Sequence, residues 1–494
     1  MNVLHLTDGY KVDHRNQYPT GTELVYSNWT PRKSRIEGVD KVVFFGLQYF
    51  IKQYLQEEFN QNFFERPKAK VIAKYRRRIN HYLGKEAITY DHVEALYDLG
   101  YLPIEIKALP EGTLVPIRTA MFTMKNTLPE FFWITNFLET IFSCILWMPC
   151  TSATMALEYR KILNKYAEMT GGDAEFVPFQ AHDFSFRGMA GMEAAMMSGA
   201  AHLLSFAGTD SIPAVDFLEE FYKADCEKEL VGSSVPATEH SVMCMGMQDE
   251  EIDTFRRLIN ETYSKGIVSI VSDTWDFWQV ITEFLVELKP EILVRDGKVV
   301  IRPDSGDPVK IICGDSNAAV GSPEFKGAVE CLWEIFGGTI SEKGYKILEE
   351  HIGLIYGDSI TLERCERICK ILETKGFAST NVVFGIGSYT YQYVTRDTFG
   401  FAMKATYGIV NGEGRAIFKN PKTDDGTKKS AKGMLRIDRV EGELVMRDEV
   451  TDEEEKGGLL EVVYRDGKLL KETSLGEVRA RLKTEIAAPE LATI

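Results

Sequence analysis

The sequence predicts an α/β protein in which an irregular parallel (β/α) barrel is combined with a discontinuous, β-rich α+β domain. Two observations lead to this prediction. From about residue 178, short apolar runs alternate with helical stretches, which is typical of βα units and a parallel sheet. After residue 397, apolar and polar residues alternate around turn dipeptides, which indicates antiparallel hairpins. We expect domains at 1–150, 151–397 and 398–494, with the first and the last packing together.

The composition limits the classes of function. The 494 residues are 44% hydrophobic and carry a formal net charge of −16, so a nucleic-acid binder with a basic footprint is not expected. The eight cysteines form no CxxC pair, and the charged start of the chain does not resemble a signal peptide. The longest apolar run, 131–148, is interrupted by Asn136 and Glu139, which favours a buried helix over a membrane span. We therefore expect a cytoplasmic enzyme that binds neither nucleic acid nor membranes.

The first 170 residues mix helices with short strands. Residues 42–59 predict an amphipathic helix, and 68–83 predict a second, basic helix. Between 102 and 124, apolar and polar residues alternate around proline and glycine turns, which indicates short strands. An apolar helix then runs to about Trp147, and a further helix is expected over 153–170.

Six apolar runs in the central part of the chain end in aspartate or glycine. These ends lie at 182–184, 208–210, 272–273, 302–307, 357–358 and 385–388. The stretches between them predict helices at 214–224, 248–264, 276–288, 322–336 and 362–375. Parallel α/β sheets keep their sites at the carboxyl ends of the strands, so the six polar ends together favour one functional site.

The last hundred residues predict hairpins over 402–419 and 433–464, with turns at Asn-Gly, Glu-Gly and Asp-Gly dipeptides. A basic cluster stands out in this acidic chain and consists of Lys419, Lys428, Lys429 and Lys432. It fits either a solvated surface loop or a flexible clamp for a polyphosphate.

The stretch 232–241 packs small residues, a proline, Glu239 and His240 into ten positions. This composition predicts a tight loop that runs into a helix, with Thr238 as a possible N-cap. A histidine near a helix N-terminus is well placed to carry or meet a phosphoryl group. A histidine that is simply hydrogen-bonded in a loop is the alternative.

Two further stretches carry groups that bind phosphates and sugars. In 299–308 a buried strand ends in a turn with Arg302, Asp304 and Asp307. Arginine holds phosphate bidentately, and aspartate accepts ribose hydroxyls or helps to hold Mg²⁺, although an internal Arg–Asp salt bridge would need the same residues. The glycine turn at 385–388 offers backbone N–H groups to a monophosphate, with Arg396 nearby in the sequence.

With these residues in place, the chain resembles the type II nicotinate and nicotinamide phosphoribosyltransferase family over nearly its whole length. The motifs that carry the resemblance lie at 7–12, 45–49, 102–108, 182–188, 206–210, 234–241 and 301–306. The resemblance implies the family's barrel fold and the transfer of phosphoribose from phosphoribosyl pyrophosphate to nicotinamide, giving nicotinamide mononucleotide and pyrophosphate in NAD salvage.

The resemblance also implies coupling to ATP. His240 would be phosphorylated by ATP, with Glu239 beside it and Asp273 orienting the ring, and the catalytic groups would be His240, Glu239, Asp273 and Asp304. Mg²⁺ would be held on the pyrophosphate rather than by direct protein ligation. A homodimer with shared active sites is expected.

The substrate contacts follow from the same resemblance. Phe184 and Tyr10, the latter from the second subunit, would sandwich the pyridine ring, and Asp210 would accept the carboxamide N–H₂. The other contacts to the base, ribose and phosphates would come from Arg187, Ser234, Ser269, Arg302, Asp304, Gly357, Asp358, Gly387, Ser388 and Arg396. The phosphates of phosphoribosyl pyrophosphate or ATP would meet Lys404, Lys419, Lys428 and, from the second subunit, Arg32.

Three positions depart from the family pattern. Phe186 lacks the hydroxyl of the usual tyrosine, Ser388 stands where glycine is common, and Ala402 replaces a serine near a phosphate-binding lysine. These departures bear on phosphate geometry rather than on the reaction.

Three other functions compete with the nicotinamide reaction. The nearest rival is a nicotinate phosphoribosyltransferase, but a carboxylate at Asp210 attracts an amide and repels nicotinate. A non-catalytic binding protein would not need the charged groups that the chain keeps, and an unrelated metal hydrolase would show clustered metal-ligand spacing.

Overall fold

The computed structural model describes residues 2–357, 359–419 and 430–487, so Asp358 and Lys428 lie outside the described residues. The chain divides into two compact units. The first comprises Met1–Thr154, Phe217–Ala224 and Val394–Ile494, and the second comprises Met155–Asp216 and Asp225–Tyr393. The first unit thus unites the two chain ends and also takes in a short segment from the middle of the chain.

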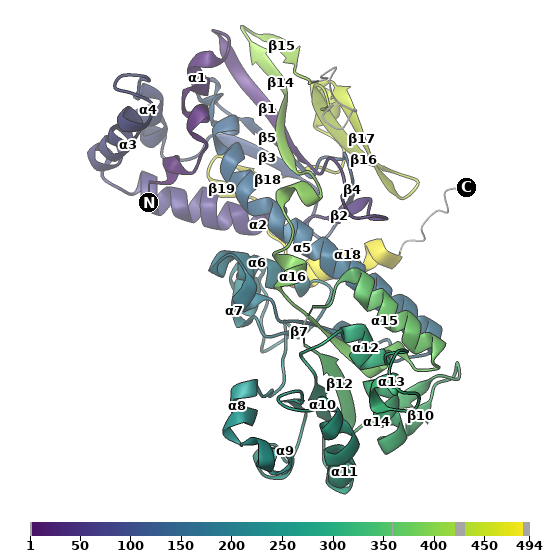
Figure 1. Cartoon of the computed structure of the whole chain (residues 1–494). Helices are drawn as coiled ribbons and strands as arrows, with labels where there is room; N and C mark the ends of the chain where they lie inside the picture. Colours follow the sequence, from purple (N-terminus) through teal and green to yellow (C-terminus); the bar gives the residue numbers. More distant parts are fainter. Residues whose placement is uncertain (1, 358, 420–429, 488–494) are drawn as a thin grey trace. The chain divides into compact units, whose positions relative to one another are not determined.

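The first unit is built on a seven-stranded antiparallel sheet to which both ends of the chain contribute (Figure 1). The strand order is β15-β14-β1-β5-β3-β18-β19, in which β1 pairs with β14 on one side and β5 on the other. The strands are β1 (Thr22–Thr30), β3 (Ile104–Ala108), β5 (Phe122–Asn126), β14 (Ala402–Val410), β15 (Glu413–Ala416), β18 (Glu461–Arg465) and β19 (Lys468–Leu469). The predicted discontinuous, β-rich domain is therefore confirmed.

Two smaller antiparallel pairs complete this unit. They are β2 (Lys41–Val43) with β4 (Leu114–Pro116), and β16 (Met434–Val440) with β17 (Glu443–Val450). The three predicted turns all close hairpins, and both of their central residues have positive φ, for example 52° at Asn411 and 75° at Gly412. This is the geometry that tight two-residue hairpin turns require.

The helices of the first unit differ from expectation in one place. The predicted helix at 42–59 is wrong at its start, because Val42 and Val43 belong to β2 and Gly46 takes a φ of 106°. The helix begins at Leu47 and continues as π-helical turns through Phe64. The α-helices of this unit are α1 (His14–Gln17), α2 (Leu47–Phe50), α3 (Lys68–Tyr82), α4 (Asp91–Leu99), α17 (Asp452–Glu455) and α18 (Leu475–Ala487).

One long helix, α5 (Ile134–Thr170), replaces the two helices expected on either side of Trp147. The expected break is wrong although Pro149 removes a backbone N–H. Cys150 and Ala153, just after the proline, are completely buried, so packing outweighs the lost hydrogen bond. The helix is long and apolar enough to cross a membrane, yet 78% of its most apolar window is buried inside the protein, as in the core helix of a globular protein.

The second unit is a parallel six-strand half-barrel, as the sequence predicts. The order β7-β6-β13-β12-β9-β8 is parallel throughout. The strands are β6 (Ala181–Asp183), β7 (Gly208–Thr209), β8 (Val268–Val271), β9 (Val299–Arg302), β12 (Ile352–Tyr356) and β13 (Val382–Ile386), with a separate hairpin of β10 (Gly338–Ile340) and β11 (Lys346–Leu348).

Helical segments alternate with these strands along the chain. They are α6 (Met192–His202), α7 (Ile212–Tyr222), α8 (His240–Met245), α9 (Glu251–Arg257), α10 (Phe277–Gln279), α11 (Leu285–Leu293), α12 (Pro308–Cys313), α13 (Pro323–Lys326), α14 (Ala328–Phe336), α15 (Leu362–Thr374) and α16 (Ser388–Tyr391). All five predicted stretches of this region are helical, with ends shifted by a few residues, but 322–336 is divided into α13 and α14 at Gly327, whose φ is 85°.

An extended segment, 233–238, joins the two edge strands of the half-barrel. Ser233 accepts a hydrogen bond from the Thr209 backbone N–H at 2.9 Å, which pairs the segment with β7. At its other end, the Thr238 N–H donates to Ser269 O and the Ser269 N–H donates to Pro236 O, both at 2.9 Å, which pairs it with β8. The segment therefore links the free edges of the open sheet.

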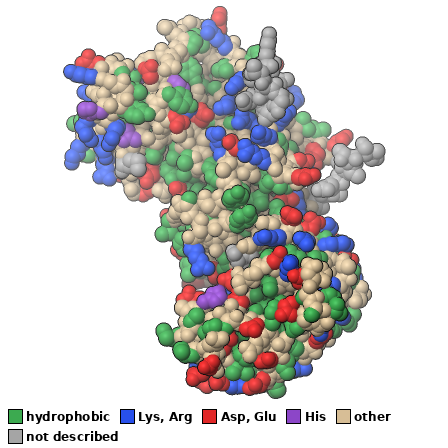
Figure 2. All heavy atoms as spheres, viewed as in Figure 1, with side chains coloured by type: hydrophobic (Ala, Val, Ile, Leu, Met, Phe, Trp, Pro, Cys, Tyr) green, Lys and Arg blue, Asp and Glu red, His purple; other side chains and the backbone are tan. Residues whose placement is uncertain are grey.

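Acidic and basic side chains are interspersed over much of the visible surface (Figure 2). Lys and Arg gather over α3, which carries six of them, namely Lys68, Lys70, Lys74, Arg76, Arg77 and Arg78. The basic character expected of this helix is therefore present on the surface.

Candidate functional site

The six polar strand ends meet at the carboxyl edge of the half-barrel. Each of the six predicted ends directly follows or completes one strand of the parallel sheet, from β6 and β7 to β12 and β13. Because parallel strands end at the same edge, their side chains converge there. The site is built from these ends and from the segment 233–238.

Asp210, just after β7, is held by two side chains. Its Oδ1 lies 2.8 Å from Nε2 of His182 and accepts a hydrogen bond from the Ser234 hydroxyl at 2.6 Å. Burial raises the pKa of Asp210, but the hydrogen bonds from His182 and Ser234 and the positive charge of Arg302 outweigh it and leave the pKa below its usual value. Asp210 therefore stays ionised at neutral pH.

His240 pairs with Asp273 at the end of β8. Its Nε2 lies 3.1 Å from Asp273 Oδ1, while Asp273 Oδ2 accepts hydrogen bonds from the Asp304 N–H at 2.8 Å and the Ser305 hydroxyl at 2.6 Å. Burial raises the pKa of Asp273, and the hydrogen bonds from Ser305, Asp304 and His240 more than reverse this. The predicted His240–Asp273 pair is thus formed, and the turn after β9 fixes the carboxylate.

Ser305 was not predicted as a site residue. It occupies the turn that carries Asp304, and its hydroxyl orients Asp273 rather than facing the sugar position expected for its neighbours. The motif itself gives no sign of this role, because the contact joins the ends of two strands that are more than thirty residues apart in the sequence.

The predicted N-cap at Thr238 is wrong. The helix α8 begins at His240 with Glu239 in the cap position, and no side chain caps it. The Thr238 hydroxyl instead accepts a hydrogen bond from the Val271 N–H at 2.9 Å, because Thr238 is drawn into the sheet edge. The carboxylate of Glu239 accepts from the Ser241 hydroxyl and is exposed, beside His240 as predicted.

Arg302, at the end of β9, binds segment 233–238. Its Nη2 donates to the Thr238 carbonyl at 2.6 Å, and its buried Nε has no hydrogen-bond partner among the described residues. Asp307 caps α12 through the Val309 N–H at 2.9 Å, so its carboxylate serves the helix. An unmet guanidinium donor beside Asp304 suits a phosphate or pyrophosphate oxygen.

Position 357 requires a glycine because its backbone lies close to the Asp304 carboxylate. A Cβ at Gly357 would lie 2.2 Å from Asp304 Oδ1, and its N–H donates to the Pro303 carbonyl at 3.1 Å. The backbone at the end of β12 therefore packs directly against the carboxylate of the neighbouring strand end.

The end of β13 carries the predicted ring and phosphate positions. Phe184 lies over Gly385, where a Cβ would come within 2.7 Å of its ring, and the Phe184 N–H donates to the Ile386 carbonyl at 2.9 Å. Ser388 is accommodated because Gly188 has no side chain; a Cβ there would lie 2.1 Å from the Ser388 hydroxyl. A Cβ at Gly387 would meet no described atom within 4 Å, so its backbone is approachable.

Two more predicted site residues, Ser269 and Arg187, lie in the second unit, as does Phe186, which departs from the family pattern. Ser269 is 5% exposed and its hydroxyl has no hydrogen-bond partner among the described residues, which suits a polar group that a ligand satisfies. Arg187 is exposed on the turn after Phe184. Phe186, beside it, is 37% exposed and offers no hydroxyl.

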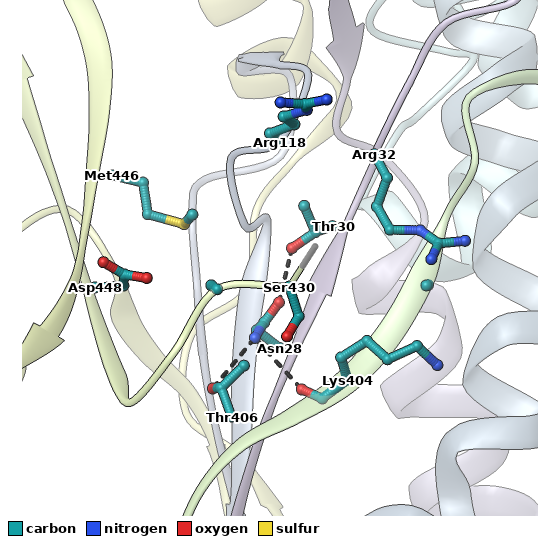
Figure 3. Close-up of a pocket in the computed structure, with 11 residues that line it drawn as sticks. Asn28, Thr30, Arg32, Arg118, Lys404, Thr406, Ser430, Met446 and Asp448 are labelled. Carbon is teal, nitrogen blue, oxygen red and sulfur yellow. Dashed lines mark hydrogen bonds between the residues drawn. The ribbon is translucent and has the colours of Figure 1, made fainter. Parts of the chain in front are cut away.

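A cationic pocket lies within the first unit and contains two predicted phosphate residues, Arg32 and Lys404 (Figure 3). It has a volume of about 280 Å³ and is also lined by Arg118, which the sequence reasoning missed, and by the departure Ala402. Figure 3 shows the Arg32 and Lys404 side chains extending in the same direction. Burial lowers the pKa of Lys404. The carboxylate of Glu139, 3.5 Å away, raises this pKa, and the positive charge of Arg32 lowers it further.

Backbone hydrogen bonds near this pocket place its Arg118 and bring Lys419 next to one of its lining residues. Arg118 has a φ of 73°, and its N–H donates to the Pro31 carbonyl at 2.6 Å, next to Arg32. Lys419 exchanges hydrogen bonds with pocket residue Ser430, its N–H donating to the hydroxyl at 2.9 Å. A single arginine in a predicted turn gives no sequence signal, which is why Arg118 was missed.

Two predicted residues of the first unit are exposed. Tyr10 is 64% exposed, with its ring edge-on to His14, and Arg396 lies 3.5 Å from the Asp397 carboxylate. The expected pairing of Tyr10 with Phe184 around the pyridine ring remains a prediction. So does the expected pairing of Arg396 with Gly387 around a phosphate.

Among the described residues, one group of three could hold a metal ion, namely Glu349, Glu350 and His351. It precedes β12 and so lies at the amino end of that strand, away from the edge that carries Asp304.

Solved structures define the class of fold. The crystal structure of nicotinate-nucleotide pyrophosphorylase from Pyrococcus furiosus aligns with a TM-score of 0.58 at 13% identity, covering 98% of this chain and 95% of that chain. The human nicotinic acid phosphoribosyltransferase aligns with a TM-score of 0.52 at 14% identity, covering 98% and 94%. The half-barrel with a sheet from both chain ends is therefore a type II phosphoribosyltransferase fold.

The sequence comparisons then give the family. Residues 179–468 match the nicotinate phosphoribosyltransferase (NAPRTase) family, and residues 2–106 match the nicotinamide phosphoribosyltransferase N-terminal domain. The chain belongs to this family of phosphoribosyltransferases.

Named relatives extend over nearly the full length. The chain is 55% identical to the nicotinamide phosphoribosyltransferase of Acinetobacter baylyi, covering 98% of both chains. It is 34% identical to that of Xanthomonas campestris pv. campestris, covering 97% of both, and 33% identical to that of Mycoplasma pneumoniae, covering 86% of this chain and 93% of the relative.

The contact between Gly357 and Asp304 generates a prediction. Gly357→Ala should lower kcat/KM for phosphoribosyl transfer by about 100-fold, because its Cβ would displace the Asp304 carboxylate. Steady-state kinetics with circular dichroism as a fold check measure this. Gly353→Ala, on the same strand, is the matched control, since its Cβ would meet the flexible Lys298 side chain at 3.2 Å. Equal kinetics for the two variants would contradict the prediction.

Proposed function

We propose that this phosphoribosyltransferase joins nicotinamide to phosphoribosyl pyrophosphate, giving nicotinamide mononucleotide and pyrophosphate in NAD salvage, with ATP hydrolysis coupled through phosphorylated His240. The observation on which the proposal rests most is the ionised Asp210 carboxylate at the carboxyl edge, in the electrostatic field of Arg302. The 55% identity to a nicotinamide phosphoribosyltransferase adds support.

The choice of base follows from the charge on Asp210. Its Oδ1 already has two partners, His182 and Ser234, which leaves the second oxygen to accept an amide N–H. A nicotinate carboxylate would place a second negative charge against Asp210 in a partly desolvated site. Phe184 offers the flat face on which the pyridine ring stacks, and Tyr10 of a second copy is proposed for the other face.

The transfer is a displacement at the anomeric carbon of the ribose. The pyridine nitrogen forms a bond to that carbon while the bond to the pyrophosphate oxygen breaks. Bound to pyrophosphate, Mg²⁺ neutralises the charge that develops on the leaving group. Arg302 adds positive charge there, and Asp304 orients the ribose, so catalysis comes from positioning and charge stabilisation.

The way His240 is held supports the proposed ATP coupling. Asp273 takes the Nε2 side of the ring at 3.1 Å, which leaves Nδ1 as the nucleophile for the γ-phosphoryl group. The bond from Nδ1 to phosphorus forms as the bond to ADP breaks, and water later releases phosphate. His240 has a side chain that is 46% exposed, as a phosphoryl acceptor requires.

The proposal includes shared sites in a homodimer and a cytoplasmic location. A second copy would bring its Tyr10 and Arg32 to the site. The 64% exposure of Tyr10 and the cationic pocket around Arg32 support the shared sites.

His240→Ala should abolish ATP hydrolysis and ATP-stimulated synthesis of the mononucleotide. The physical reason is that no other group would receive the phosphoryl from ATP. A coupled assay of ADP and mononucleotide measures both, with His351→Ala as a histidine control at the other edge of the sheet. Unchanged stimulation by ATP in His240→Ala would refute the phosphohistidine.

Asp210→Ser should lower the preference for nicotinamide over nicotinate by at least about tenfold, because the repelling charge is removed. The measurement is kcat/KM for both bases with the unmutated chain and the variant. A preference of the unmutated chain for nicotinate would overturn the choice of base.

A further inference from the structure

His182 occupies the centre of β6 and faces the site, where the function proposed above uses it only as one of the two partners of Asp210. Its side chain is 12% exposed, and its Nε2 lies 2.8 Å from Asp210 Oδ1. The imidazole therefore touches the carboxylate that chooses the base.

Gly208 on β7 leaves room for the ring of His182. His182 pairs with Gly208 across the parallel sheet, and a Cβ at Gly208 would lie 2.7 Å from His182 Nδ1. The Phe184 ring covers another side, with its centroid 4.7 Å from that of the imidazole. Because glycine leaves this room, the imidazole can reach across to Asp210.

The contact decides which oxygen of Asp210 is offered to a ligand. His182 and the Ser234 hydroxyl both bind Oδ1. Among the described residues no hydrogen bond to Oδ2 is found, so Oδ2 is the acceptor that remains for an amide N–H.

We propose that His182 is a positioning residue that determines base specificity: its hydrogen bond to Oδ1 holds the Asp210 carboxylate with Oδ2 toward the base. In that orientation Oδ2 accepts the N–H of an amide and repels a carboxylate. The inference rests on the proposed function and deepens it.

Two buried polar groups, His202 and Asp183, lie next to His182 and are satisfied by other partners. His202 on α6 is fully buried, bonds the carbonyls of Ala181 and Gly208, and has its pKa lowered to about 4, mainly by burial. Asp183, also fully buried, accepts hydrogen bonds from the backbone and hydroxyl of Ser185.

The remaining charges keep Asp210 ionised. Its pKa is held below the usual value by His182, Ser234 and, from β9, Arg302, against the effect of burial.

The experiment measures the ratio of kcat/KM for nicotinamide to kcat/KM for nicotinate at a single pH. Effects common to both bases, including any at His240, cancel in this ratio. His182→Gln should keep most of the preference for nicotinamide, because the glutamine amide can also donate a hydrogen bond to Oδ1.

Two further variants test the assignment. His182→Leu removes the donor, so the ratio should drop by about tenfold, with a thermal melt as the fold check. His351→Gln is the matched control, because His351 also pairs with a carboxylate, that of Glu349, at 2.8 Å in the same unit, and it should keep the ratio of the unmutated chain.

The outcomes separate the inference from the proposed function. A ratio for His182→Leu equal to that of the unmutated chain, or an equal drop of the ratio in His182→Gln and His182→Leu, would overturn the inference while nicotinamide is still used. Failure of the unmutated chain to use nicotinamide would overturn the proposed function itself.

Discussion

The site depends on the hydrogen bonds that tie segment 233–238 to both edges of the half-barrel. Ser233 pairs with β7, and the backbone around Ala237 pairs with β8. Between these anchors the chain places Ser234 against Asp210, and just beyond them it delivers His240 to Asp273. One short segment thus positions both the group proposed to select the base and the group proposed to receive phosphate.

The carboxylates of Asp210 and Asp273 have lowered pKa values for the same physical reason. Burial disfavours their charge, yet each has fixed donors that more than compensate: His182 and Ser234 at Asp210, and Ser305, the Asp304 N–H and His240 at Asp273. A carboxylate with one oxygen committed to the protein presents the other in a fixed direction. This preorganisation suits a reaction in which positioning and charge stabilisation supply most of the catalysis.

Much of the site could be predicted because polar residues at strand ends are visible in a sequence. The pairing of six strands in parallel then brings distant motifs such as Asp210 and Arg302 to one edge without further information. His182, Ser305 and Arg118 were missed because their roles depend on partners distant in the sequence or, for Arg118, on a backbone turn. Thr238 was misjudged for a related reason: a hydroxyl before a helix predicts a cap, and only the fold reveals that β8 uses it.

Amide hydrogen exchange by mass spectrometry, resolved to single residues, tests the central claim most directly. If segment 233–238 joins the two edges, the amides of Thr209, Ser233, Thr238, Ser269 and Val271 should exchange as slowly as those inside the sheet. Exchange of Ser233 and Thr238 at the rate of an unpaired surface loop would contradict the account, because neither Ser234 nor His240 would then be held at the edge.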